Sequence, residues 1–269
     1  MENRENNELQ KGGASRPFTC KEKAMKKNIK LTIEYDGSNY HGWQSQINAV
    51  AVQDVVEKAI RKITSEEIKV TGASRTDVGV HAYGQTANFF TQSPIPVEKF
   101  PYAINSALPD DIVIKRAEEV DEEFHSRFSA KGKKYRYLIY NARIPSALMR
   151  NRAYFVPVDL DEKAMEKAAQ HFLGSHDFSA FKATGSDVKS NVRTITGVSL
   201  KRQDEIIQFE IEGNGFLYNM VRIIAGTLVA VGQGKIGPEE IPEIIASGDR
   251  KKAGLTAPAH GLYLVELYY

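Results

Sequence analysis

The spacing of hydrophobic residues predicts a chain in which strands and helices follow one another. From Ile29 to Tyr35, apolar residues alternate with polar ones, as in a strand that buries only one of its faces. The same spacing predicts further strands at residues 67–71, 85–90, 112–114, 134–140 and 207–212. Because the clear strands alternate rather than being apolar throughout, we expect an antiparallel or mixed sheet with one covered face.

Four other segments carry apolar residues three and four positions apart, which predicts helices with one buried side. These helices are expected at residues 51–63, 97–108, 159–173 and 216–231. The third should begin with a capping box formed by Asp159 and Glu162. The fourth is apolar on nearly all sides, so it should be buried. Helices packed against a sheet of this kind indicate an α+β fold.

Composition narrows the function classes without choosing one. The chain has 269 residues, a formal net charge of +2 and one cysteine, so no internal disulfide can form. The total charge does not indicate a nucleic-acid-binding protein by itself, so clustered cations would have to do so. The histidines show no spacing typical of a metal site, and we expect no metal. The polar residues 1–26 predict a disordered tail, and no apolar run is long enough to span a membrane.

One apparent cofactor motif lies in the wrong context. Residues 232–237 match the pattern GxGxxG, but they follow a predicted helix, whereas a dinucleotide-binding loop follows a strand. No phosphate-binding GxxxxGK[ST] sequence occurs either. We therefore expect no cofactor.

The segment from 72 to 85, which joins two predicted strands, carries more chemistry than a turn requires. Its three glycines would let the backbone approach another molecule closely. Arg75 lies two residues before Asp77, and His81 and Tyr83 follow. An Asp in such a loop most often caps its own turn, so a catalytic role for Asp77 needs further support.

Arg222 is the only charged residue within the apolar helix predicted at 216–231. A buried guanidinium without a partner is costly, and no acidic residue lies within one helical turn of it. Either the side chain reaches the surface, or a carboxylate from a distant segment meets it. Asp77 is the partner that would also explain a functional loop.

Cations and aromatic residues alternate between residues 124 and 140. From Lys134 onward, Tyr135 faces one side of a predicted strand, and Lys134 and Arg136 face the other. A solvated cationic face is the commoner origin of such a pattern, and RNA contact is the more specific one. The cations that would then contact phosphates are Lys131, Lys133, Lys134 and Arg136. On this hypothesis Lys134→Ala weakens RNA binding and flattens its salt dependence.

Three segments resemble blocks of the tRNA pseudouridine synthase A family. They are Arg-Thr-Asp-Val-Gly-Val-His-Ala at 75–82, Lys-Tyr-Arg-Tyr at 134–137 and Asn-Gly-Phe-Leu-Tyr-Asn-Met-Val-Arg at 214–222. Further similarities, in the family's order, extend the resemblance from Ile29 to Tyr269. The chain departs from the family pattern at Ser74, where Gly is usual, and at Val78, where Ala is frequent.

The resemblance implies a fold and an activity. The expected fold is that of pseudouridine synthases, with two similar subdomains, 27–120 and 121–269, around a basic cleft. The expected protein is a homodimer that binds tRNA and isomerises uridine to pseudouridine on the 3′ side of the anticodon arm. A cytoplasmic location is expected separately, because the sequence shows no secretory signal and no membrane-length apolar run. Asp77 would be catalytic, Arg222 would pair with it, and Tyr135 would line the uridine pocket. Arg75 could occupy the position that the extruded base leaves.

Two other classes of protein remain open. A tRNA-binding or folding module without catalysis would need the basic strand but not a pair between Asp77 and Arg222. A glycoside hydrolase would use a carboxylate, but that class usually has two acids flanking the bond, and this loop supplies one.

Overall fold

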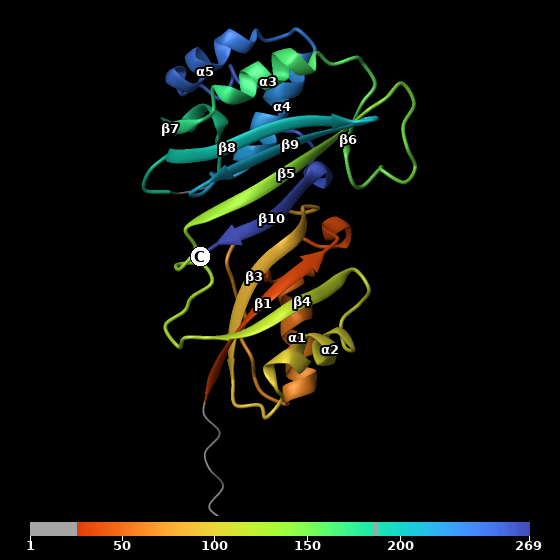
Figure 1. The fold of residues 1–269 in the computed structure, drawn as a ribbon, viewed down its shortest axis with the longest axis vertical. Coiled ribbons are helices and arrows are strands. Elements are labelled where there is room, and N and C mark those ends of the chain that lie inside the picture. The colour runs from red at the N-terminus through yellow and green to blue at the C-terminus, as the bar shows by residue number, and fades with distance from the viewer. Residues whose placement is uncertain (1–25, 186–187) are drawn as a thin grey trace, which may run out of the picture.

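The structure of the protein is a computed structural model that describes residues 26–185 and 188–269 (Figure 1). Its strands are β1 (Lys27–Tyr35), β2 (Thr71–Gly72), β3 (His81–Thr91), β4 (Ile112–Val120), β5 (Gly132–Asn141), β6 (Tyr154–Val156), β7 (Gly174–Asp177), β8 (Val192–Gln203), β9 (Ile206–Gly213) and β10 (Leu262–Tyr268). Its α-helices are α1 (Val52–Thr64), α2 (Phe100–Asn105), α3 (Glu162–Gln170), α4 (Met220–Gly232) and α5 (Ile241–Ser247). The predicted tail lies, apart from its last residue, outside the described residues.

The described strands form one mixed sheet, as the alternating patterns predicted. Their order is β4-β1-β3-β10-β5-β9-β8-β7, with β2 paired to β3 and β6 paired to β5. Only β10 with β3 and β5 with β6 are parallel pairs among these strands. The α+β class with a mixed sheet and helices packed on it is therefore confirmed.

The last strand of the chain joins the two halves of the sheet. β10 lies between β3 and β5, so the C-terminal segment contacts both groups of strands. In Figure 1, α1 and α2 lie beside β1, β3 and β4, whereas α3, α4 and α5 lie beside β7, β8 and β9. The division into subdomains at residue 120 stays a prediction. Within the described residues, no helix is both long and apolar enough to cross a membrane.

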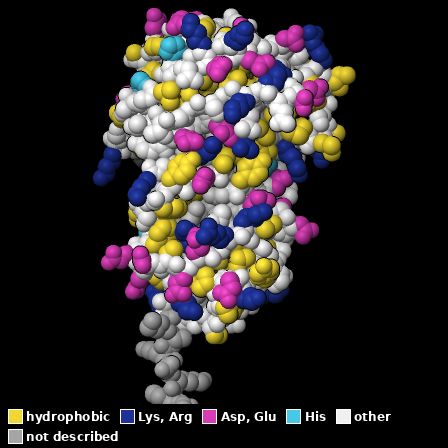
Figure 2. Space-filling view, in the orientation of Figure 1, with side chains coloured by type: hydrophobic (Ala, Val, Ile, Leu, Met, Phe, Trp, Pro, Cys, Tyr) yellow, Lys and Arg dark blue, Asp and Glu magenta, His cyan; other side chains and the backbone are white. Residues whose placement is uncertain are grey.

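Both groups of helices cover the same face of the sheet. Leu264 of β10 pairs with Tyr135 of β5 and with Ala82 of β3, so these three residues belong to the same face of the sheet. This face holds buried residues of both halves, such as Leu31 of β1 and Phe209 of β9. The opposite face carries no helix in the described part of the chain, and Figure 2 shows charged side chains of both signs among hydrophobic ones on it.

Two predicted elements are shorter than the sequence pattern suggested. The strand predicted at 67–71 joins the sheet only at β2, although Ile68 and Val70 are buried. The helix predicted at 97–108 is a single 3-10 turn followed by α2, with Pro101 in the first turn as expected. In both cases the apolar spacing reports burial correctly, but the regular element covers fewer residues than the buried ones.

Two predicted helix starts are wrong. Asp161 rather than Asp159 caps α3, and its carboxylate accepts a hydrogen bond from the backbone N–H of Ala164 (3.0 Å). α4 does not include residues 216–219, because Asn219 has a left-handed backbone conformation (φ 59°) and ends the preceding turn. The apolar residues before α4 therefore form a loop rather than a helical turn.

Candidate active site

Three buried contacts hold the segment that carries Asp77. The Tyr35 hydroxyl group of β1 lies 2.7 Å from the Thr76 hydroxyl group, and the Trp43 backbone N–H donates to the Thr76 carbonyl (3.2 Å). The Gln85 side chain holds Ser74 through two bonds, since its amide donates to the Ser74 carbonyl (2.6 Å) and its oxygen accepts from the Ser74 N–H (3.3 Å). Asp77 therefore lies on a fixed backbone.

Glycines let the chain pack closely around this loop. Gly42 has φ +82°, and a Cβ there would lie 2.3 Å from the Thr76 carbonyl oxygen. A Cβ at Gly72 would lie 2.0 Å from the Trp43 ring nitrogen, and one at Gly84 would lie 2.4 Å from the Val265 carbonyl oxygen. The sequence suggested that the loop glycines admit another molecule, but at positions 72 and 84 they admit the chain itself.

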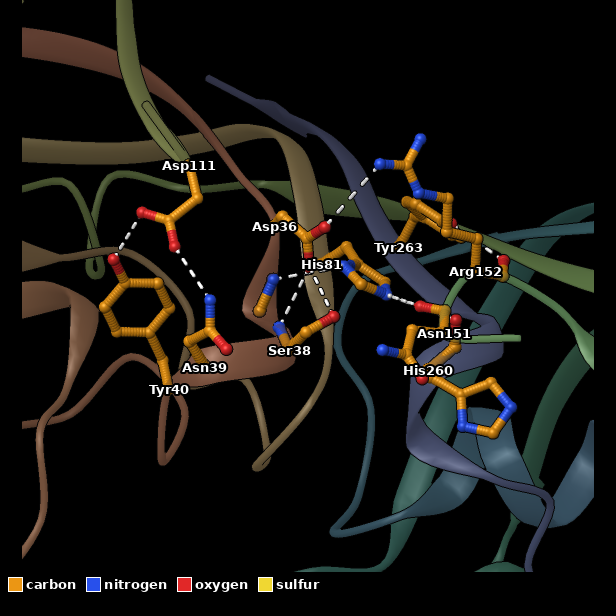
Figure 3. Close-up of polar contacts among 11 residues, drawn as sticks. Asp36, Ser38, Asn39, Tyr40, His81, Asp111, Asn151, Arg152, His260 and Tyr263 are labelled. Carbon is orange, nitrogen blue, oxygen red and sulfur yellow. Dashed lines mark hydrogen bonds and ion pairs between the residues drawn. The ribbon is translucent and has the colours of Figure 1, made fainter. Parts of the chain in front are cut away.

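His81 anchors the far end of the loop (Figure 3). Its Nδ1 accepts a hydrogen bond from the Gly37 N–H (3.0 Å), so Nε2 carries the proton and donates to the Asn151 carbonyl (2.9 Å). The ring stacks on Tyr263 with 4.7 Å between centroids. Burial lowers the pKa of His81, although the Asp36 carboxylate opposes this effect. A neutral His81 thus ties three separate segments together.

Asp77 and Arg222 form the ion pair that the sequence suggested. Arg222 Nη1 lies 3.3 Å from Asp77 Oδ2, across 145 residues of chain. The same guanidinium donates to the Asn219 side-chain oxygen (2.8 Å) and to the Ala257 carbonyl (2.8 Å). Arg222 therefore does not reach out to solvent, and the Asp77 carboxylate is engaged by another element rather than by its own turn.

Burial and the ion pair act on Asp77 in opposite directions. The Asp77 side chain keeps 29% of its exposure and that of Arg222 keeps 17%. Burial raises the pKa of Asp77, and the Arg222 charge lowers it by less, so the pKa lies above the ordinary value for Asp. Arg222 thus reduces the rise in the pKa of Asp77 that burial causes, but it does not reverse that rise.

Tyr135 lies beside this pair and is almost fully buried. Its hydroxyl group is 3.1 Å from the Ser74 hydroxyl group, and its ring packs edge-on against Phe216 (5.2 Å). Burial raises the pKa of Tyr135 to about 12. Ser74 also accepts a hydrogen bond from Lys133 Nζ (3.0 Å), and its backbone is not in the left-handed region. A side chain at position 74 is therefore tolerated, and it links Tyr135 to Lys133.

These residues line an open pocket of about 1000 Å³. Its wall includes Asp77, Arg222, Tyr135, Lys133, Arg127 and the exposed Arg75. The Arg75 side chain contacts Gln44, with its Nε 3.3 Å from the amide oxygen. Asp77 is the one carboxylate among the residues that line this pocket in the described part of the chain.

The four basic residues singled out from the sequence do not lie on one surface of the protein. Lys133 lines the pocket, whereas Lys134 and Arg136 point to the opposite face of β5. There Lys134 pairs with the Glu210 carboxylate (2.9 Å), and so does Arg136 (2.8 Å). Lys131 is not among the residues that line the pocket and is exposed just before β5. The structure thus brings only Lys133 of this group to Asp77.

Two site residues were not identified from the sequence. Asn219 holds Arg222 in place, and Ser74 contacts both Tyr135 and Lys133. Asn219 could have been found, because Asn tolerates left-handed backbone and here precedes a helix that contains a buried Arg. Nothing in the pattern around Ser74 indicates its contacts, which come from a strand much later in the chain. No group of three His, Cys, Asp or Glu in the described residues could hold a metal ion.

Comparison with known proteins assigns the chain to a family. A sequence profile described as tRNA pseudouridine synthase matches residues 31–129 and 168–269. The chain belongs to the tRNA pseudouridine synthase family. A family member from Acetivibrio thermocellus, named tRNA pseudouridine synthase A, is 63% identical over 243 residues, covering 90% of this chain and 100% of the relative. A relative of the same name from Ruminiclostridium cellulolyticum is 63% identical over 244 residues, again covering 90% and 100%.

The family assignment agrees with the features that the sequence singled out. Both matched ranges contain a member of the ion pair, since Asp77 lies in the first and Arg222 in the second. One solved structure, the archaeal box H/ACA sRNP Nop10-Cbf5 complex, is similar at 11% identity with a TM-score of 0.36, covering 75% of this chain and 44% of that one. That likeness is too weak to add to the assignment.

Proposed function

We propose that the protein isomerises uridine to pseudouridine in the anticodon stem-loop of tRNA, with Asp77 acting on a flipped-out uridine. The observation that carries this proposal is the pair of Asp77 and Arg222 inside a pocket whose other charged residues are cations. A uridine within a stem cannot reach such a pocket, so the base must first leave the stack, at a cost of about a few kcal/mol.

The proposed reaction exchanges one glycosidic bond for another. The bond from C1′ to N1 breaks, the uracil ring turns, a bond from C1′ to C5 forms, and the proton on C5 leaves while N1 gains one. Asp77 serves as the nucleophile: its carboxylate bonds to C1′ as the bond to N1 breaks, and it is released as C5 bonds to C1′. It must be ionised for this step, and Arg222 favours that form. The reaction changes no oxidation state and transfers no external group, so it requires no cofactor.

The other pocket residues supply positioning. The Tyr135 ring lines the pocket and is proposed to contact the extruded base. Its hydroxyl group would take the C5 proton only in the ionised form, which burial disfavours. Arg75 is exposed at the pocket rim and is proposed to fill the place that the base leaves in the stem. Lys131 and Lys133 are proposed to contact phosphates. For Lys134 and Arg136 the ion pairs with Glu210 favour a weaker contribution than the sequence suggested.

We further propose a cytoplasmic homodimer. Support comes from the face of the sheet opposite the helices, where Tyr83 stacks on Tyr263 (5.1 Å) and Arg136 lies over Tyr83 (5.6 Å). Tyr83 keeps 42% of its exposure, so this surface has an aromatic group available to a second copy. Light scattering should give twice the mass of the 30.0 kDa chain; a monomer at micromolar concentration would refute the dimer.

The test of the proposed reaction is Asp77→Asn. The change removes the charge and keeps the size, so the loop should fold and RNA should still bind. With tRNA labelled with tritium at C5 of uridine, the native protein should release tritium and the variant should release none. Release by Asp77→Asn would refute the role of Asp77. A native protein that binds tRNA without releasing tritium would instead favour a non-catalytic binding module.

A further inference from the structure

Lys133 differs from its neighbour Lys134 in that no carboxylate of the described residues pairs with it. Lys134 Nζ lies 2.9 Å and 3.2 Å from the carboxylates of Glu210 and Glu212. Lys133 Nζ donates to the neutral Ser74 hydroxyl group (3.0 Å), and within the described residues no acid lies within 4.0 Å of it. Two adjacent lysines on one strand therefore have opposite electrostatic surroundings.

Two arginines add to the charge around Lys133. Across the sheet Lys133 pairs with Gly213, which pairs with Ile195, and Arg193 lies two residues before Ile195 on the same face. Arg127, from the turn before β5, lines the same pocket as Lys133. Neither arginine forms an ion pair with a described residue, and Arg193 donates only to backbone carbonyls among them.

This arrangement is unfavourable in the absence of an anion. Burial lowers the pKa of Lys133 to about 8, with the charges of Arg127 and Arg193 acting in the same direction. Among the residues that the structure describes, the charged and titratable groups that line this pocket or face Lys133 are His41, Arg75, Asp77, Arg127, Tyr135, Arg193, Tyr218 and Arg222. Asp77 is the acid among them, and its charge is already engaged by Arg222. A ligand with negative charge would compensate the cluster.

We propose that Lys133, Arg127 and Arg193 bind one phosphodiester group of the RNA, next to the nucleotide whose base enters the Asp77 pocket. Guanidinium groups present paired donors that match phosphate oxygens, and an ammonium adds a compact charge. The Ser74 hydroxyl group holds the Lys133 side chain toward the pocket. The inference rests on the proposed function, because it takes RNA to be the ligand.

The pH dependence of RNA binding tests the site. Phosphate binding requires charged Lys133, so affinity should decrease as the pH rises above about 8, by up to tenfold per pH unit. Binding of an anticodon stem-loop RNA would be measured by fluorescence anisotropy from about pH 6.5 to 9.5, in an Asp77→Asn background that prevents turnover. In Lys133→Arg the charge does not titrate in this range, so the decrease should disappear.

Salt dependence supplies a matched pair of variants. Lys133→Gln should reduce the slope of log affinity against log salt by at most about one, because one of the three cations at a single phosphate is lost. Lys134→Gln should keep the native slope, because that lysine is neutralised within the protein. Equal slopes for the two variants, or an unchanged pH dependence in Lys133→Arg, would overturn the proposal.

Two further measurements separate the ligand source and the proposed reaction. A stem-loop with a methylphosphonate beside the target uridine should weaken binding to the native protein more than binding to Lys133→Gln, which keeps the two arginines of the site. Competition by inorganic phosphate alone would indicate a site for a free anion and overturn the assignment to RNA. If native protein shows the pH and salt effects without releasing tritium, the proposed reaction fails while the phosphate site stands. If it releases tritium without those effects, the reaction stands and the phosphate site fails.

Discussion

Replacing Arg222 by Met removes the charge beside Asp77 and keeps an apolar side chain of similar length in α4. In the native protein the guanidinium contacts three groups, the Asp77 carboxylate, the Asn219 side chain and the Ala257 carbonyl. The variant leaves all three without this partner. We expect two separable effects, one on the ionisation of Asp77 and one on stability.

The expected size of each effect follows from the geometry. An adjacent Arg lowers the pKa of a carboxyl group by about one to three units. Since Asp77 and Arg222 keep 29% and 17% of their exposure, in an open pocket, the lower end applies. The acidic limb of the pH profile of kcat/KM should therefore move about one pH unit higher. At a pH below the limb, kcat/KM of the variant should then be about tenfold lower than that of the native protein. The unsatisfied Ala257 carbonyl adds a stability loss of about 1–3 kcal/mol.

The assay is tritium release under single-turnover conditions from about pH 4.5 to 8.5, which lies on the side to which burial raises the pKa of Asp77. Stability is measured by urea unfolding. Arg222→Lys is the control, because it keeps a charge near Asp77 while losing the three-way hydrogen bonding. It should lose stability with a smaller shift of the limb. If Arg222→Met shows the native limb, Arg222 does not govern the ionisation of Asp77, and the reasoning about the pair is wrong.

Two further predictions concern the loop that carries Asp77. Gly42→Ala should destabilise the fold more than Gly234→Ala in thermal unfolding. Both glycines have positive φ, but of these two positions only 42 would bring the new Cβ against a neighbour, the Thr76 carbonyl. Equal losses of stability in the two variants would refute this. Since burial lowers the pKa of His81 from 6.5, the unfolded chain binds protons more readily, so stability should decrease as the pH falls below about 6.5. His81→Gln should flatten that decrease in urea unfolding curves.

Local patterns in the sequence predicted the elements that repeat a simple period. β1 and β9 alternate cleanly because one face of each is buried against helices. The start of α4 was not predictable from periodicity, since apolar residues continue through 216–219 and only the backbone of Asn219 separates loop from helix. Apolar spacing reports which residues are buried, and it does not report which hydrogen bonds the backbone makes.

The ion pair was inferred from an energetic imbalance rather than a pattern. An Arg in an apolar helix needs a partner, and that requirement can be stated without knowing the fold. The pKa of Asp77 could not be obtained in this way. The charge of Arg222 lowers this pKa, whereas burial raises it and has the larger effect.

The basic strand shows most clearly where sequence reasoning ends. Alternation along β5 placed Tyr135 on one face and Lys134 on the other, and the structure agrees. Whether a cation on either face is free to bind RNA depends on acids that the pattern does not reveal. Glu210 neutralises Lys134 from a strand far along the chain, and no comparable acid faces Lys133 in the described residues. The neighbouring strand β9 therefore decides which of the two adjacent lysines is available to a phosphate. This cannot be inferred from the sequence pattern, because it depends on the register in which β5 and β9 pair.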